Sequence, residues 1–132
     1  MKIGFIGLGR MGKEMVLNML DNKQQVVAHN RSPKPIKQVA KYGAIPAYSI
    51  EELCSKLGKK KIVWIMIKSG KPVDDTIKSL LPFLNKGDLI IDGGNSFYTD
   101  SVKRHKALAK KGIGYLDIGV SGGIESARNN AC

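Results

Sequence analysis

The chain has 132 residues, of which 42% are hydrophobic and 25% are charged, and its formal net charge is +11. This composition is that of one globular domain, and no apolar run approaches the roughly 20 residues that cross a bilayer. The charge suggests an anionic partner, although a solvated lysine-rich surface is the simpler explanation. Because the short apolar start runs into glycines, it is no signal peptide, and we expect a cytoplasmic location.

Short apolar runs alternate along the chain with amphipathic segments. The predicted strands are 2–6, 25–29, 44–47, 61–66, 88–92 and 115–118, and the predicted helices are 11–21, 34–42, 49–58, 72–84 and 100–111. Most strands lack strict alternation, as is typical of strands buried on both faces of a parallel sheet. This order predicts an α/β fold with a doubly wound, mainly parallel sheet in a single domain over residues 1–132. In the last helix we expect Val102, Leu108 and Ala109 to face the core.

A glycine-rich turn follows the first predicted strand and opens the first predicted helix. Its residues are Gly7, Leu8, Gly9, Arg10, Met11 and Gly12. Gly7 permits the tight turn, Gly9 lets the backbone approach a pyrophosphate, and Gly12 allows close helix–strand packing. The N-terminus of the helix adds free N–H groups and partial positive charge. In this context the motif predicts the dinucleotide-binding turn of a Rossmann fold, and we expect all six residues to contact the cofactor.

The second predicted strand ends in Asn30, Arg31 and Ser32. NAD-binding folds usually place a carboxylate here, about 20 residues after the glycine turn, to bind the ribose 2′-OH. Without that carboxylate nothing repels a 2′-phosphate, and the planar guanidinium of Arg31 can pair with one. The sequence therefore favours NADP over NAD. The alternative is that Arg31 stacks on adenine or pairs elsewhere.

Ile67 and Lys68 follow the strand 61–66, and their position places them along the dinucleotide unless Lys68 is only a surface lysine. The loop 92–96 reads Asp-Gly-Gly-Asn-Ser, and its Asn95 can both donate and accept hydrogen bonds.

A further glycine-rich loop, 117–123, ends in Ser121, Gly122 and Gly123. Glycines expose backbone N–H groups to anionic ligands, so we expect the loops 92–96 and 117–123 to meet the reacting end of a substrate. The two cysteines, Cys54 and Cys132, have no metal-ligand spacing, so we expect reduced thiols and no metal site.

Together these motifs resemble those of the decarboxylating 6-phosphogluconate dehydrogenases, within the wider β-hydroxyacid dehydrogenase group. The similarity covers essentially the whole chain, and the Asp-Gly-Gly-Asn-Ser loop is specific to the phosphogluconate branch. The resemblance implies an NADP-dependent oxidoreductase of the pentose phosphate pathway, which oxidises 6-phosphogluconate and decarboxylates it to ribulose 5-phosphate. It implies cofactor contacts from Gly7–Gly12, Asn30, Arg31, Ser32, Ile67, Lys68 and Asn95, and substrate contacts from Asn95, Ser121, Gly122 and Gly123.

The resemblance also implies groups that this sequence lacks. The family's catalytic lysine and its partner glutamate lie in a helical domain beyond residue 132, and neither Lys68 nor His105 replaces them. We therefore expect a fragment without a catalytic residue, and a full-length homodimer that forms through the helical domain. Glu125 and Ser126 depart from the family pattern, so the resemblance does not define the backbone path after Gly123.

Two other functions compete with this interpretation. One is the cofactor domain of a related 3-hydroxyacid dehydrogenase, for example of the 3-hydroxyisobutyrate type. The other is a non-enzymatic nucleotide-binding module. No recognised nucleic-acid motif accompanies the basic surface, so we expect a small phosphorylated sugar acid as the partner, and neither nucleic acid nor a membrane.

Overall fold

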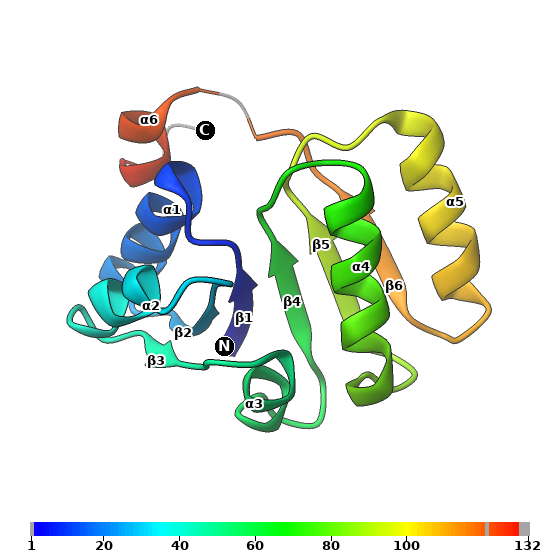
Figure 1. Ribbon diagram of the computed structural model, residues 1–132, viewed down its shortest axis with the longest axis horizontal. Helices are drawn as coiled ribbons and strands as arrows, with labels where there is room; N and C mark the ends of the chain where they lie inside the picture. The colour runs from blue at the N-terminus through cyan, green and yellow to red at the C-terminus, as the bar shows by residue number, and fades with distance from the viewer. Residues whose placement is uncertain (1, 121, 130–132) are drawn as a thin grey trace.

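A six-stranded parallel sheet runs through the centre of the molecule (Figure 1). The computed structural model describes residues 2–120 and 122–129. The strands are β1 (Lys2–Ile6), β2 (Gln25–His29), β3 (Ile45–Pro46), β4 (Ile62–Ile65), β5 (Leu89–Asp92) and β6 (Gly114–Asp117), in the spatial order β3-β2-β1-β4-β5-β6. The strand order reverses between β1 and β4, which makes their carboxyl ends the topological switch point. The predicted doubly wound α/β fold is confirmed.

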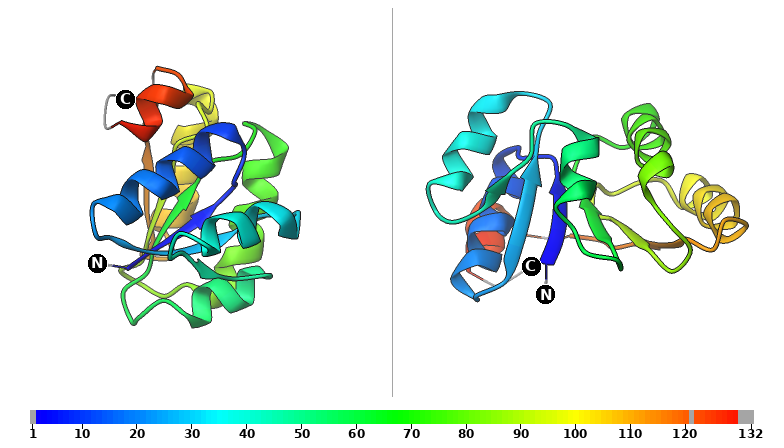
Figure 2. Two further views of the ribbon diagram at one scale, coloured as in Figure 1. Left: turned by 90° about the vertical axis from the view of Figure 1, so that its left-hand side faces the viewer. Right: turned by 90° about the horizontal axis from the view of Figure 1, so that it is seen from below.

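Helices cover both faces of this sheet, as the view from below in Figure 2 shows. They are α1 (Arg10–Asp21), α2 (Pro33–Ala40), α3 (Ile50–Ser55), α4 (Lys71–Leu80), α5 (Tyr98–Ala109) and α6 (Ile124–Arg128). The apolar sides of α1, α2 and α6 share one buried cluster, and those of α3, α4 and α5 share the other. Among the described residues, no helix combines the length and hydropathy that a bilayer crossing demands.

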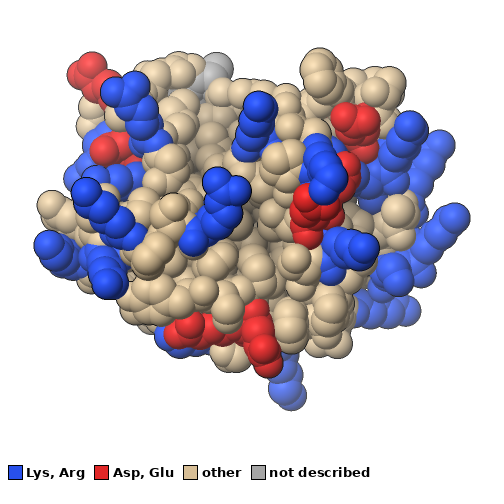
Figure 3. All heavy atoms as spheres, in the orientation of Figure 1, with Lys and Arg blue, Asp and Glu red and all other residues tan. Residues whose placement is uncertain are grey.

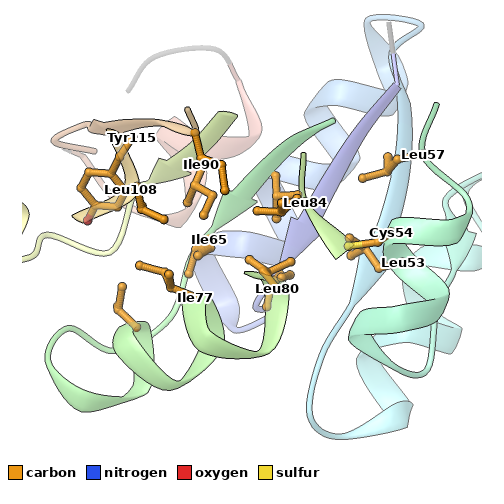
Figure 4. Packing of buried hydrophobic residues seen from close by; sticks show 14 of the residues in the cluster. Leu53, Cys54, Leu57, Ile65, Ile77, Leu80, Leu84, Ile90, Leu108 and Tyr115 are labelled. Carbon is orange, nitrogen blue, oxygen red and sulfur yellow. The ribbon is translucent and has the colours of Figure 1, made fainter. Parts of the chain in front are cut away.

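The side chains of β4 show why the sheet is apolar on both faces. Val63 and Ile65 belong to the cluster beneath α4, whereas Trp64 and Met66 pack against the opposite cluster. The Trp64 ring stacks on that of Phe5, with 6.2 Å between ring centroids. Figure 4 shows the cluster beneath α4 and α5, in which leucines and isoleucines from helices and strands interlock. Two buried faces require apolar residues at successive positions, which removes the alternation of a one-sided strand.

Three predicted helices differ from the observed ones, and the first of them, 49–58, is shorter than expected, since α3 stops at Ser55. The predicted helix 72–84 ends early, because α4 stops at Leu80 and a 3-10 turn, η1 (Leu81–Phe83), contains Pro82, which has no N–H to continue an α-helix. The inward face of α5 was predicted correctly only at Leu108. Ala109 is exposed and Val102 is only partly buried, whereas Ser101, Arg104 and Leu108 form the buried face.

The sequence did not predict α6. This helix lies beside α1, on the opposite side of the molecule from β6 (Figure 1). Ala127 is 1% exposed, and the Asn18 side chain on α1 donates to its carbonyl oxygen at 3.0 Å. Arg128 forms ion pairs with Glu14 and Asp21 of α1. Five residues are too few to establish a helical periodicity in sequence.

Candidate functional site

A pocket of about 640 Å³ opens at the carboxyl ends of β1 and β2, next to the switch point. The turn after β2, the loop after β4, the first residue of α3 and one face of α4 form its walls. The lining residues are Ile6, Gly7, His29, Asn30, Arg31, Ser32, Ile50, Ile67, Lys68, Pro72, Asp75, Thr76 and Ser79. Pockets of about 300–1,000 Å³ are typical of small-molecule sites. Six residues predicted to contact the cofactor thus come together: Gly7, Asn30, Arg31, Ser32, Ile67 and Lys68.

The glycine-rich turn has a shape that side chains would prevent. Gly7 has φ 103°, and a Cβ there would lie 2.2 Å from the carbonyl oxygen of Met66. A Cβ on Gly12 would lie 2.1 Å from the Gly7 oxygen, so the helix packs directly on the turn. In contrast, nothing lies within 4 Å of a Cβ on Gly9, the N-cap of α1. The space beside this N-cap is therefore open, and because the first N–H groups of a helix lack intrahelical acceptors, the arrangement fits a pyrophosphate.

Asn30 joins the end of β2 to this turn. Its Oδ1 accepts the Leu8 N–H at 2.9 Å, and its Nδ2 donates to the Ser32 carbonyl at 3.2 Å. The Leu8 side chain is 3% exposed and belongs to the core. Leu8 and Asn30 thus maintain the shape of the turn, and direct cofactor contact by either stays a prediction.

Exposed cations lie at the rim of the pocket and on the turn. Arg31 and Lys68 line the pocket and are exposed, and Arg10 is exposed as the first residue of α1. Ser32 is the N-cap of α2, but its hydroxyl makes no capping hydrogen bond and so stays available to a ligand. Among the lining residues, Asp75 alone is a carboxylate, and it pairs with Lys71 at 2.8 Å. The pocket is therefore suited to an anion.

Sequence reasoning missed the wall that α4 contributes. Pro72, Asp75, Thr76 and Ser79 recur at helical spacing and so lie on one side of that helix, which is the signal that could have identified them. His29 also lines the pocket, and its Nδ1 lies 2.9 Å from the Ala47 carbonyl oxygen. Because a carbonyl only accepts, Nδ1 carries the proton in this contact.

The loop after β5 differs from our expectation. A Cβ on Gly93 would lie 2.6 Å from Trp64 Nε1, and one on Gly94 would lie 2.3 Å from the Ile67 oxygen. The Gly93 N–H donates to the Ile65 carbonyl and the Gly94 N–H to the Asp92 carboxylate, both at 2.9 Å. The interpretation that these glycines present N–H groups to a ligand is therefore wrong. They are needed because this loop packs tightly on the end of β4.

The remaining predicted residues lie outside the pocket. Asn95 is exposed and has φ 58°, a left-handed conformation that asparagine tolerates better than most residues. Gly122 and Gly123 are exposed, and Gly123 is the N-cap of α6. Ser121 lies outside the described residues. A substrate role for these four positions stays a prediction.

A buried polar cluster holds the loop after β5 and involves residues that the sequence did not single out. The Asp92 carboxylate is fully buried and accepts hydrogen bonds from the hydroxyls of Ser96, at 2.5 Å, and Tyr115, at 2.6 Å. Burial, together with the bond to Asp92, raises the pKa of Tyr115 to about 12. Arg104 Nη1 lies 3.7 Å from the same carboxylate. Its position on a lysine-rich helix gave no signal that this cation is buried.

Outside the pocket and this cluster, the described part of the chain offers no reactive thiol and no metal site. Burial raises the pKa of the Cys54 thiol to about 11, which disfavours the reactive thiolate. Within residues 2–120 and 122–129, no group of three or more His, Cys, Asp or Glu could hold a metal ion. Basic side chains are spread over the face seen in Figure 3 and are densest on the side of α5.

Comparisons with known proteins agree with this geometry. The family model for the NAD binding domain of 6-phosphogluconate dehydrogenase matches residues 2–131. The decarboxylating 6-phosphogluconate dehydrogenase of Chlamydia muridarum is 49% identical over 131 residues, which are 96% of this chain and 27% of that protein. The Haemophilus influenzae enzyme of the same name is 48% identical over 132 residues, with the same two coverages. The chain thus spans about a quarter of the length of these relatives.

Solved structures give the same fold. Plasmodium falciparum 6-phosphogluconate dehydrogenase, described with NADP+ and with 6-phosphogluconate, has a TM-score of 0.88 at 36% identity and covers 97% of this chain and 29% of its own. Mycobacterium tuberculosis 3-hydroxyisobutyrate dehydrogenase has a TM-score of 0.87 at 26% identity, with coverages of 97% and 43%. The glycine turn, the pocket at the switch point and a family match over nearly every residue lead to one conclusion. The chain belongs to the NAD(P)-binding domain family of 6-phosphogluconate dehydrogenase.

Proposed function

We propose that this chain is the NADP-binding domain of a decarboxylating 6-phosphogluconate dehydrogenase, which converts 6-phosphogluconate to ribulose 5-phosphate. Backbone similarity does not discriminate between relatives, because the TM-scores of the two dehydrogenases are 0.88 and 0.87. Sequence identity is higher with the phosphogluconate enzyme, at 36%, than with the 3-hydroxyisobutyrate enzyme, at 26%, which supports the phosphogluconate activity. The names of the curated relatives support the same activity.

The choice of NADP depends on one observation: Arg31 is exposed at the rim of a pocket in which the strand-end position holds an amide rather than a carboxylate. That amide, Asn30, is bonded to the glycine turn. In this proposal the N-terminus of α1 holds the pyrophosphate, and Arg31 with Ser32 holds the 2′-phosphate. NADP, when bound, accepts the hydride from the substrate.

The substrate end of the site is assigned to the loops beyond the pocket. Ile67, Lys68 and Asn95 continue the cofactor path toward β5, and Asn95 with Ser121, Gly122 and Gly123 contacts a phosphorylated sugar acid. The proposal places no catalytic residue within this chain, which spans 27% of the two curated relatives described above. The homodimer is likewise assigned to sequence outside it.

The Arg31→Ala variant tests the cofactor choice. Removal of a charge-assisted hydrogen bond costs about 1.5–3 kcal/mol, so we expect the Kd for NADPH to rise roughly tenfold to a hundredfold while that for NADH changes little. Titrations followed by nicotinamide fluorescence give both constants.

Lys37→Ala is the matched control, because it removes one exposed positive charge from the last turn of α2, the helix that follows the same turn. It should leave both constants nearly unchanged. If the wild-type protein binds NADH more tightly than NADPH, or if Arg31→Ala weakens both equally, the NADP assignment is wrong. Absence of turnover of 6-phosphogluconate by the full-length protein would refute the substrate assignment.

A further inference from the structure

Arg104 is a buried cation on the inward face of α5. Its side chain is 6% exposed, although the lysines around it on the helix face solvent. Its Nε donates to Asp74 Oδ1 at 2.7 Å, and its Nη2 donates to the Gly70 carbonyl at 3.1 Å. Burial of a guanidinium is costly unless fixed partners compensate for it. The partners of Arg104 therefore show what this charge holds in place.

Two of those partners belong to the start of α4 and the loop before it. Gly70 is the N-cap of α4 with φ 93°, and Asp74 lies in the first turn of the helix. The loop that Gly70 ends, residues 66–70, contains Ile67 and Lys68, which line the pocket. Arg104 thus fixes the end of this loop from the side opposite the pocket wall.

The third partner of Arg104, Asp92, holds the loop that follows β5. Asp92 Oδ2 lies 3.7 Å from Arg104 Nη1, a nitrogen that makes no hydrogen bond within the described residues. The same carboxylate accepts the Gly94 N–H at 2.9 Å and the Ser96 hydroxyl at 2.5 Å. Asp92 therefore shapes the loop 93–96, which contains Asn95, and the Arg104 charge stabilises that carboxylate.

The two loops also touch directly. A Cβ on Gly94 would lie 2.3 Å from the Ile67 oxygen, so no side chain separates their backbones. Loops 66–70 and 93–96 therefore form one unit, and the Arg104 guanidinium reaches Gly70 at the end of the first loop and Asp92 just before the second. A shift of the first loop would break the bond from Arg104 to Gly70, and a shift of the second would break the bonds that Asp92 accepts from Gly94 and Ser96.

We propose that Arg104 is a positioning residue, which sets the relative position of loops 66–70 and 93–96 and so the affinity for the nicotinamide half of the cofactor. This inference rests on the proposed function, which assigns Lys68 and Asn95 to the cofactor path. The adenosine half is assigned to the turn after β2, which is separated from β5 by β1 and β4. The two halves of NADP should therefore respond differently to loss of Arg104.

The test compares Arg104→Gln with Lys106→Gln, which removes the same charge from an exposed position of the same helix. Isothermal titration gives the Kd for NADPH and for adenosine 2′,5′-bisphosphate, the phosphorylated-adenosine end of the cofactor. For Arg104→Gln we expect the Kd for NADPH to rise about tenfold, while that for the bisphosphate stays within roughly twofold. Lys106→Gln should change neither by more than about twofold.

Asp74→Ala is a milder second variant, because the Asp74 side chain is 60% exposed and its loss frees one end of the guanidinium. Asp74→Ala should weaken NADPH binding selectively, but less than Arg104→Gln does. If Arg104→Gln does not fold, the result for Asp74→Ala tests the proposal. Equal weakening of both ligands would show a merely structural role and overturn the proposal, as would unchanged NADPH binding. A wild-type protein that binds neither ligand would instead overturn the proposed function, and this inference with it.

Discussion

Two glycines three positions apart in the first turn have opposite surroundings. A side chain on Gly12 would collide with the Gly7 carbonyl at 2.1 Å, whereas a side chain on Gly9 would meet nothing within 4 Å. Gly12 is therefore required by the fold. Packing does not require Gly9, and the open space beside it is what the proposed pyrophosphate site needs. The same comparison assigns Gly94 to packing.

This difference predicts separate effects of two alanine variants. Gly12→Ala should destabilise the protein by about 1–3 kcal/mol, because backbone atoms must move to admit the methyl group. Gly9→Ala should change stability by less than about 1 kcal/mol but weaken NADPH binding at least tenfold, because the methyl group occupies the approach of the pyrophosphate. Urea denaturation and NADPH titration measure the two effects. Normal NADPH binding by Gly9→Ala would contradict the role assigned to this turn.

The short helix α3 shows how local chemistry defines an element. Ser49, at which the predicted helix 49–58 begins, is its N-cap, and its hydroxyl accepts the Glu52 N–H at 3.0 Å. The Glu52 carboxylate in turn accepts the Tyr48 N–H at 2.7 Å. These bonds satisfy donors that a six-residue helix cannot satisfy internally.

Ser49→Ala should therefore lower the free energy of unfolding by about 1 kcal/mol, as loss of an N-cap usually does. Ser55→Ala is the control on the same helix, because its exposed hydroxyl bonds only to the Glu52 carbonyl and its loss should cost less than about 0.5 kcal/mol. The midpoints of urea unfolding give both values. Equal midpoints for the two variants would show that the cap does not stabilise α3.

Elements with a strong local signal could be predicted from the sequence. The apolar strands, the glycine turn and the start of the third predicted helix at residue 49 each depend on residues that are adjacent in sequence. Arg104 could not be predicted, because a cation among lysines on an amphipathic helix is expected to face solvent, and its partners lie 12 to 34 positions away in sequence. The packing role of Gly93 and Gly94 was missed for a similar reason, since it depends on how closely β4 approaches.

At the scale of the whole molecule, an ion pair between helices makes the free energy of unfolding depend on pH. The hydrogen bond from Arg104 holds the pKa of Asp74 below its ordinary value of 3.8. Because the folded pKa is lower than the unfolded one, the unfolded state takes up a proton first as the pH falls. The contribution of this pair is therefore complete above the unfolded pKa and is lost as the pH falls through the folded pKa.

Between about pH 5 and pH 3, the wild-type protein should lose stability more steeply than Asp74→Asn, whose side chain does not titrate. The difference should be modest, because the Asp74 side chain is 60% exposed and solvent screens its charge. Urea unfolding at several pH values measures the two slopes. Parallel slopes would show that the Asp74–Arg104 pair contributes no pH-dependent stability.

The docking of α6 on α1 has a consequence for the order of folding. Asn18 and Ala127, which join the two helices, are 109 positions apart in sequence. Contacts of such long range form late, since the entropy of closing the intervening chain must be overcome before they add stability. During synthesis α6 can dock only after all six strands have emerged. We therefore expect Gly123, the N-cap of α6, to take its place after the six strands that carry the pocket have paired.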